Sequence, residues 1–136
     1  MPSETGAAVQ SRRAVLAFGG DVTLARRQHV FLTEIQKGNK QFDLPAFMGA
    51  DLRLVNLECV ISSRGEQGRD KGEGGPHYFR ARPEMVTVLQ NMSVDIVATA
   101  NNHSGDYGAD ALLDQARWLE AAGIAHAGSG LSLIHI

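Results

Sequence analysis

The chain has 136 residues, and its 13 Lys and Arg residues nearly balance its 15 Asp and Glu residues. The formal net charge of −2 argues against electrostatic binding to nucleic acid or to an anionic membrane surface, and the single cysteine excludes an internal disulfide. Length and composition are typical of one globular domain. We expect residues 1–13 to be a flexible lead-in; they show no signal peptide, and no stretch of the sequence is long and apolar enough to span a bilayer.

Four short apolar runs, each ended by glycine or polar residues, predict strands of a largely parallel sheet, and the first two are apolar enough to be buried. They cover residues 14–18, 51–58, 95–100 and 124–127. Apolar residues at helical spacing predict two longer helices, a single helical turn that begins at a proline, and a short helix after the first strand. These helices fall at 83–92, 109–122, 45–48 and within 22–36. The alternation of strands and helices predicts an α/β fold.

Polar side chains follow three of the predicted strands at the point where each strand ends. They are Asp21 after the first, Asn56 and Glu58 at the second, and Asn101, Asn102 and His103 after the third. Because the carboxyl ends of parallel strands meet at one edge of the sheet, we expect these side chains to lie together. Carboxylate and amide oxygens with one imidazole suit Mn, Mg, Fe or Zn. Such a metal could polarise a phosphoryl oxygen or generate a hydroxide, with His103 as ligand or general acid.

Most of these residues also have a plain structural explanation. Asp21 after glycine can cap a helix or close a turn, and Glu58 can lie exposed at a sheet edge. The block 101–103 favours function, because three consecutive polar residues at the end of a buried strand need hydrogen-bond partners or a ligand. Arg80 is either an anion-binding side chain or solvated surface. Asp106 is interpreted as a cap and turn that opens the following helix.

Several sequence blocks occur in an order that resembles a known bacterial family. The blocks are Gly-Asp-Val-Thr-Leu at 20–24, Ala-Asp-Leu to Asn-Leu-Glu at 50–58, Phe-Arg-Ala-Arg-Pro-Glu at 79–84, Ala-Asn-Asn-His at 100–103, Asp-Tyr-Gly at 106–108 and Gly-Ile to Gly-Ser-Gly at 123–130. With them, residues 14–130 resemble the N-terminal half of the capsule-synthesis CapA domain, also called the PgsA or poly-γ-glutamate biosynthesis domain. The combination of Asn-Asn-His and Asp-Tyr-Gly with Asn-Leu-Glu is the specific part of the resemblance.

The resemblance implies a metal site, because this family is related to the calcineurin-like metallophosphoesterases. It implies the N-terminal half of a metallophosphoesterase-like α/β sandwich of two sheets, with one or two divalent ions. By the resemblance Asp21, Glu58 and Asn102 correspond to metal ligands, and His103 corresponds to the catalytic imidazole. Thr23 stands where phosphoesterases usually carry a histidine, so a weakened first metal site or a single metal is implied.

The resemblance also implies a role in making or anchoring capsule polymer. The implied function is a metal-dependent phosphoester hydrolase of poly-γ-glutamate synthesis, to which Asn56, Asn101 and Arg80 would contribute substrate contacts. The alternative is a non-catalytic module that binds the polymer or a synthase subunit. Polymer precursors or a small phosphoester are the expected substrates. Members of the family are often membrane-anchored or exported, whereas this sequence shows no anchor, so the location, cytoplasmic or outside, stays open.

The last six residues, 131–136, break the family pattern. Their sequence, Leu-Ser-Leu-Ile-His-Ile, is the translation of CTG TCT CTT ATA CAC ATC, a transposon end used in sequencing libraries. We therefore expect residues 131–136 not to be native, and the gene to continue past Gly130 into a half that supplies further His ligands and the second sheet. The alternative is a natural short apolar C-terminus. On this expectation the chain as written is unstable or aggregating, and inactive.

Overall fold

The computed structural model describes residues 13–68 and 77–128. The expected lead-in, apart from Arg13, and the expected non-native tail at 131–136 lie outside the described residues. Among the described residues, no helix combines the length and the apolar character that a membrane span requires.

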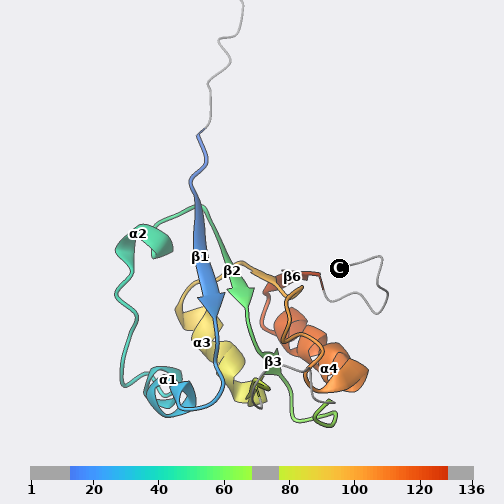
Figure 1. The fold of residues 1–136 in the computed structure, drawn as a ribbon. Coiled ribbons are helices and arrows are strands. Elements are labelled where there is room, and N and C mark those ends of the chain that lie inside the picture. The colour runs from blue at the N-terminus through green and yellow to red at the C-terminus, as the bar shows by residue number, and fades with distance from the viewer. Residues whose placement is uncertain (1–12, 69–76, 129–136) are drawn as a thin grey trace, which may run out of the picture.

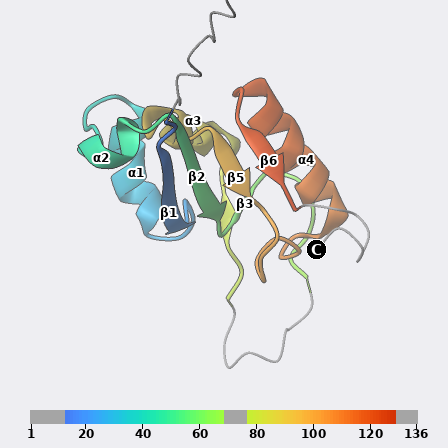
Figure 2. The same ribbon diagram turned by 90° about the horizontal axis from the view of Figure 1, so that it is seen from above.

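The described residues form an α/β fold around a parallel sheet of four strands, as predicted. The strands are β1 (Leu16–Val22), β2 (Leu52–Leu57), β5 (Ile96–Ala98) and β6 (Ala125–Ala127). Their order in the sheet is β1-β2-β5-β6, and every neighbouring pair is parallel, as Figure 2 shows. A second, two-stranded sheet pairs β3 (Val60–Ile61) with β4 (Arg80–Ala81), and two-residue strands are too short to show a periodic pattern in the sequence.

The helices lie close to their predicted positions. They are α1 (Gln28–Gln36), α2 (Pro45–Met48), the 3₁₀ turn η1 (Pro83–Met85) that continues into α3 (Val86–Asn91), and α4 (Gly108–Ala121). Figure 1 shows α1 and α3 on the β1 and β2 side of the molecule and α4 beside β6. Prolines begin α2 and η1, where a missing N–H costs nothing. Gly123, at a φ of +72°, ends the turn after α4.

The core lies on one face of the sheet. Val55, Leu57 and Val97 point to this face and are at most 1% exposed. They belong to one apolar cluster with buried residues of the helices, such as Leu89 of α3 and Leu119 of α4. Successive strand residues point to opposite faces, so Leu52 and Leu54 of β2 belong to the other face of the sheet.

The prediction that the first strand is buried is wrong. Phe18 is 72% exposed and Leu16 is 55% exposed. β1 is an edge strand, and Leu16 and Phe18 stand in register with Leu52 and Leu54 on the face opposite the core. An apolar run of this length has the same pattern whether or not something packs on it, so sequence periodicity could not reveal the exposure.

Candidate functional site

A bulge in β1 positions the first of the predicted site residues. Phe18 pairs with Leu54, and in unbroken register Gly20 would then stand opposite Asn56, but the register shifts and Asp21 takes that place. Gly20 adopts a φ of +69°, which glycine tolerates. The sequence pattern predicted that the glycines end the strand, whereas the strand passes through them to Val22. The bulge brings the Asp21 carboxylate to Asn56.

Side-chain amides join the ends of three strands into one hydrogen-bonded group. Asn56 Nδ2 donates to Asp21 Oδ1 at 2.8 Å. Asn101 Nδ2, which follows β5, donates to Asn56 Oδ1 at 3.1 Å and to the Leu57 carbonyl at 2.9 Å. Asn101 Oδ1 accepts the backbone N–H of His103 at 3.0 Å. The structure therefore brings Asp21, Asn56, Asn101 and His103 together at the carboxyl edge of the sheet.

The imidazole of His103 is buried and held on two sides. Its Nδ1 lies 2.8 Å from Asp106 Oδ2, and the two side chains are 5% and 0% exposed. The same Asp106 oxygen accepts the backbone N–H of Phe79 at 2.7 Å. The Phe79 ring stacks on the imidazole, with 4.0 Å between centroids. Because a carboxylate accepts a hydrogen bond at Nδ1, the proton of the neutral ring is on Nδ1. Nε2 is therefore the nitrogen that can exchange a proton with a ligand.

Asp106 is the site residue that the sequence analysis missed. It was interpreted as a helix cap, but α4 begins at Gly108 with Tyr107 as its N-cap and has no side-chain cap bond. Asp106 is instead fully buried against the imidazole. The backbone N–H of Asp106 donates to the His103 carbonyl at 3.2 Å, which closes a turn and brings residues i and i+3 together. The spacing His-x-x-Asp was the available signal.

The remaining predicted metal ligands lie at the same edge of the sheet. The backbone N–H of Glu58 donates to the Val22 carbonyl at 2.9 Å, which puts Glu58 beside the end of β1, and Asn102 is exposed in the turn before His103. Two carboxylates and an amide oxygen are ligand types that suit a hard divalent cation, and a metal site made by Asp21, Glu58 and Asn102 stays a prediction. Within residues 13–68 and 77–128, no group of three or more His, Cys, Asp or Glu could hold a metal by itself.

Arg80, a predicted substrate contact, binds the protein's own backbone. Its Nη2 donates to the carbonyls of Arg64 and Gly65, both at 2.8 Å. Its guanidinium carbon lies 3.6 Å from the centroid of the Tyr107 ring. These contacts tie the segment after β3 to the start of α4, and the structure gives no contact between Arg80 and the group formed by Asp21, Asn56 and Asn101.

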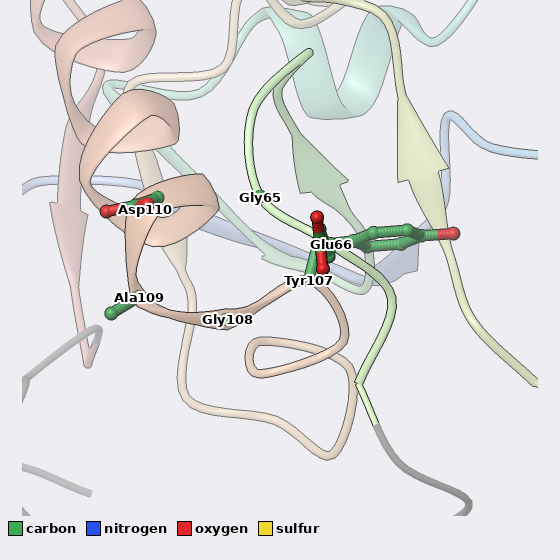
Figure 3. Close-up of a pocket in the computed structure, with 6 residues that line it drawn as sticks. All are labelled: Gly65, Glu66, Tyr107, Gly108, Ala109 and Asp110. Atoms are coloured by element: carbon green, nitrogen blue, oxygen red, sulfur yellow. The ribbon is translucent and has the colours of Figure 1, made fainter.

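A hollow of about 700 Å³ lies at the start of α4, next to these contacts (Figure 3). Gly65, Glu66, Tyr107, Gly108, Ala109 and Asp110 line it. None of the predicted site residues is among them. The charged side chains in the lining, Glu66 and Asp110, are both negative. The polar residues at the carboxyl edge of the sheet therefore remain the candidate site.

Comparison with known proteins identifies the family. Residues 15–134 match the family described as bacterial capsule synthesis protein PGA_cap. The chain belongs to this capsule-synthesis family, which confirms the resemblance seen in the sequence.

Curated relatives agree with this assignment. An uncharacterized protein of Sinorhizobium fredii is 34% identical over 118 residues, which cover 83% of this chain and 24% of the relative. A probable polyglutamine synthesis accessory protein of Mycobacterium tuberculosis is 36% identical over 84 residues, which cover 62% of this chain and 21% of the relative. The chain thus spans about a quarter or less of the length of these relatives.

Proposed function

We propose that this chain contributes part of a metal-dependent phosphoester hydrolase site that serves polyglutamate capsule synthesis. The observation that carries the proposal is the buried pair of His103 and Asp106 beside the strand-end group of Asp21, Asn56 and Asn101. A buried imidazole oriented by a carboxylate is the usual arrangement of a general acid or base. The polyglutamine accessory role in the name of the mycobacterial relative supports the biological setting.

In this proposal His103 acts as the general acid. As a water oxygen forms its bond to phosphorus and the phosphorus–oxygen bond to the leaving group breaks, the leaving oxygen takes the bonding electron pair and receives a proton from Nε2, while the attacking water gives up a proton to the solvent. Asp106 holds Nδ1–H throughout and stabilises the imidazolium before the proton leaves. Phe79 fixes the ring plane by stacking on it. Proton transfer therefore needs no reorientation of the imidazole.

The strand-end group positions the oxygen ligands. Asn56 orients the Asp21 carboxylate, and Asn101 in turn orients Asn56 and the backbone at His103. Asp21, Glu58 and Asn102 would hold the divalent ion, which supplies Lewis-acid polarisation of a phosphoryl oxygen when bound. Because the amides of Asn56 and Asn101 already bond to each other, we assign them to positioning rather than to direct substrate contact.

The proposal is tested on the complete product of the gene that encodes this chain. Hydrolysis of bis(p-nitrophenyl) phosphate is measured with Mn²⁺, Mg²⁺ or Zn²⁺, for the wild type, for His103→Ala and for the matched control His126→Ala. His126 lies on β6 and contacts Glu120 at 3.5 Å. We expect His103→Ala to lower kcat by about 10²- to 10⁴-fold with metal content unchanged, and His126→Ala to keep wild-type activity. Equal activity of wild type and His103→Ala would contradict the proposal.

A second candidate function is a non-catalytic module that binds the polymer or a synthase subunit. The observation that favours it is the exposed aliphatic and aromatic side chains of β1, Leu16 and Phe18 among them. Exposed apolar surface of this kind is typical of protein contact sites. A wild-type protein that turns over no phosphoester with any of the three metals would favour this second function.

A further inference from the structure

A basic hollow lies next to the candidate site, and Phe79 is the one residue of its described lining that the mechanism above uses. Its volume is about 490 Å³, and its lining comprises Thr23, Ala25, Arg26, Arg27, Gln28 and Phe79. That volume falls in the range of small-molecule sites. Of the described residues that line it, two carry a positive charge and none is acidic, so its charge favours an anion.

The hollow is physically connected to the candidate site at two points. The centroid of the Phe79 ring lies 4.0 Å from the centroid of the His103 imidazole. It also lies 4.8 Å from the guanidinium carbon of Arg26. A neighbouring hollow of about 290 Å³ is lined by Asp21 and shares Thr23 and Gln28 with the basic one. The basic hollow therefore borders the hollow that Asp21 lines and the Phe79 ring that stacks on His103.

The backbone at Arg26 supports this assignment. Arg26 has a φ of +58°, a conformation that residues other than glycine rarely adopt. In this conformation the guanidinium lies over Phe79. Residues held in such conformations occur often at ligand-binding sites.

We propose that this basic hollow binds an oxyanion of the substrate, a carboxylate or a phosphate, next to the group that reacts at His103. Guanidinium groups recognise the paired oxygens of either anion through parallel N–H donors. The inference rests on the proposed hydrolytic function and adds to it a substrate that carries a second negative group. An acidic polymer unit or a compound with a further phosphate would meet this requirement.

The test measures anion binding directly, without turnover. Calorimetric titrations of the complete gene product use two probes, inorganic phosphate and triglutamate. Arg27→Gln and Arg26→Gly are compared with the wild type, and Arg117→Gln, an exposed arginine of α4, is the matched control. Glycine adopts the backbone conformation of Arg26 without steric cost, so Arg26→Gly is expected to keep the wild-type melting temperature.

We expect Arg26→Gly and Arg27→Gln each to weaken binding about tenfold, and Arg117→Gln to change it less than about twofold. Binding of phosphate alone supports a phosphate subsite, and binding of triglutamate alone supports a carboxylate subsite. Failure of both probes to bind the wild type would overturn the proposal, as would an equal loss in Arg117→Gln.

His103→Ala separates this proposal from the proposed function. The variant is expected to bind both probes with wild-type affinity, because its side chain does not line the basic hollow. Loss of anion binding in His103→Ala would place the anion at the imidazole and overturn the proposal. A wild type that binds the anions at Arg26 and Arg27 but hydrolyses no phosphoester would instead refute the hydrolase function alone.

Discussion

Both faces of the four-stranded sheet carry aliphatic side chains, but only one face is buried. On β2, Val55 and Leu57 are at most 1% exposed, whereas Leu52 is 36% exposed. On the same face of β1, Phe18 is 72% exposed. The helices build the core on one side only, so burial in this sheet is decided by what packs against a strand rather than by the hydrophobicity of the strand itself.

The largest expected effect compares two thiols, one on each side of this division. Burial raises the pKa of the Cys59 thiol to about 12, well above that of an ordinary thiol. Its reactive thiolate is thus about a thousandfold scarcer than that of an ordinary thiol below pH 9. A cysteine introduced by Phe18→Cys is exposed and is expected to react with Ellman's reagent at an ordinary rate. Equal labelling rates of the two thiols in the native protein would contradict the difference in burial between Cys59 and position 18.

The second prediction compares two leucines of the same strand. Leu57→Ala removes a fully buried side chain and should lower the free energy of unfolding by about 2–5 kcal/mol. Leu52→Ala, on the uncovered face, should lower it by less than about 1 kcal/mol. Urea denaturation followed by circular dichroism measures both values. Similar losses for the two variants would show that the Leu52 face is covered in solution.

The third prediction concerns pH and the end of the sheet opposite the site. The side-chain hydrogen bonds from Arg53 Nε and Nη2, at 2.7 and 2.9 Å, hold the pKa of Asp95 below its ordinary value. Because the folded-state pKa is the lower one, the stabilisation is complete above the unfolded pKa of about 4 and is lost as the pH falls through the folded value. Thermal melts of Asp95→Asn should therefore depend less on pH between about 4 and 2 than wild-type melts do. An unchanged pH dependence would contradict the pairing.

The smallest expected effect on stability comes from Phe18→Thr. Threonine is β-branched and favours strands as phenylalanine does, and it removes an exposed ring, so the free energy of unfolding should change by less than about 0.5 kcal/mol. Light scattering at high concentration should fall, because an exposed apolar edge strand promotes association. A loss of more than 2 kcal/mol would show that Phe18 is packed. The expectation that the chain as written aggregates stays a prediction, and this variant tests its cause.

The sequence pattern predicted the four strands of the main sheet, the longer helices and the polar edge, because each depends on local periodicity or on the parallel order of strands. It did not predict the extension of β1, since Gly19 and Gly20 resemble a strand end and only the pairing with β2 shows the bulge. A Cβ at Gly19 would lie 2.9 Å from the Val55 side chain, so that glycine reflects close packing. The sequence pattern also did not predict the contact of Asp106 with His103, because an aspartate just before a helix is typical of a cap.

The pairing of His103 with Asp106 is tested most directly by a long-range ¹H–¹⁵N spectrum of the imidazole nitrogens. Held by the Asp106 carboxylate at 2.8 Å, Nδ1 is expected to carry the proton in the neutral ring, and Nε2 to show the shift of an unprotonated nitrogen. In Asp106→Asn this preference should be lost, while the signals of His126 stay unchanged. A neutral wild-type ring protonated at Nε2, or spectra that Asp106→Asn does not alter, would contradict the site described here.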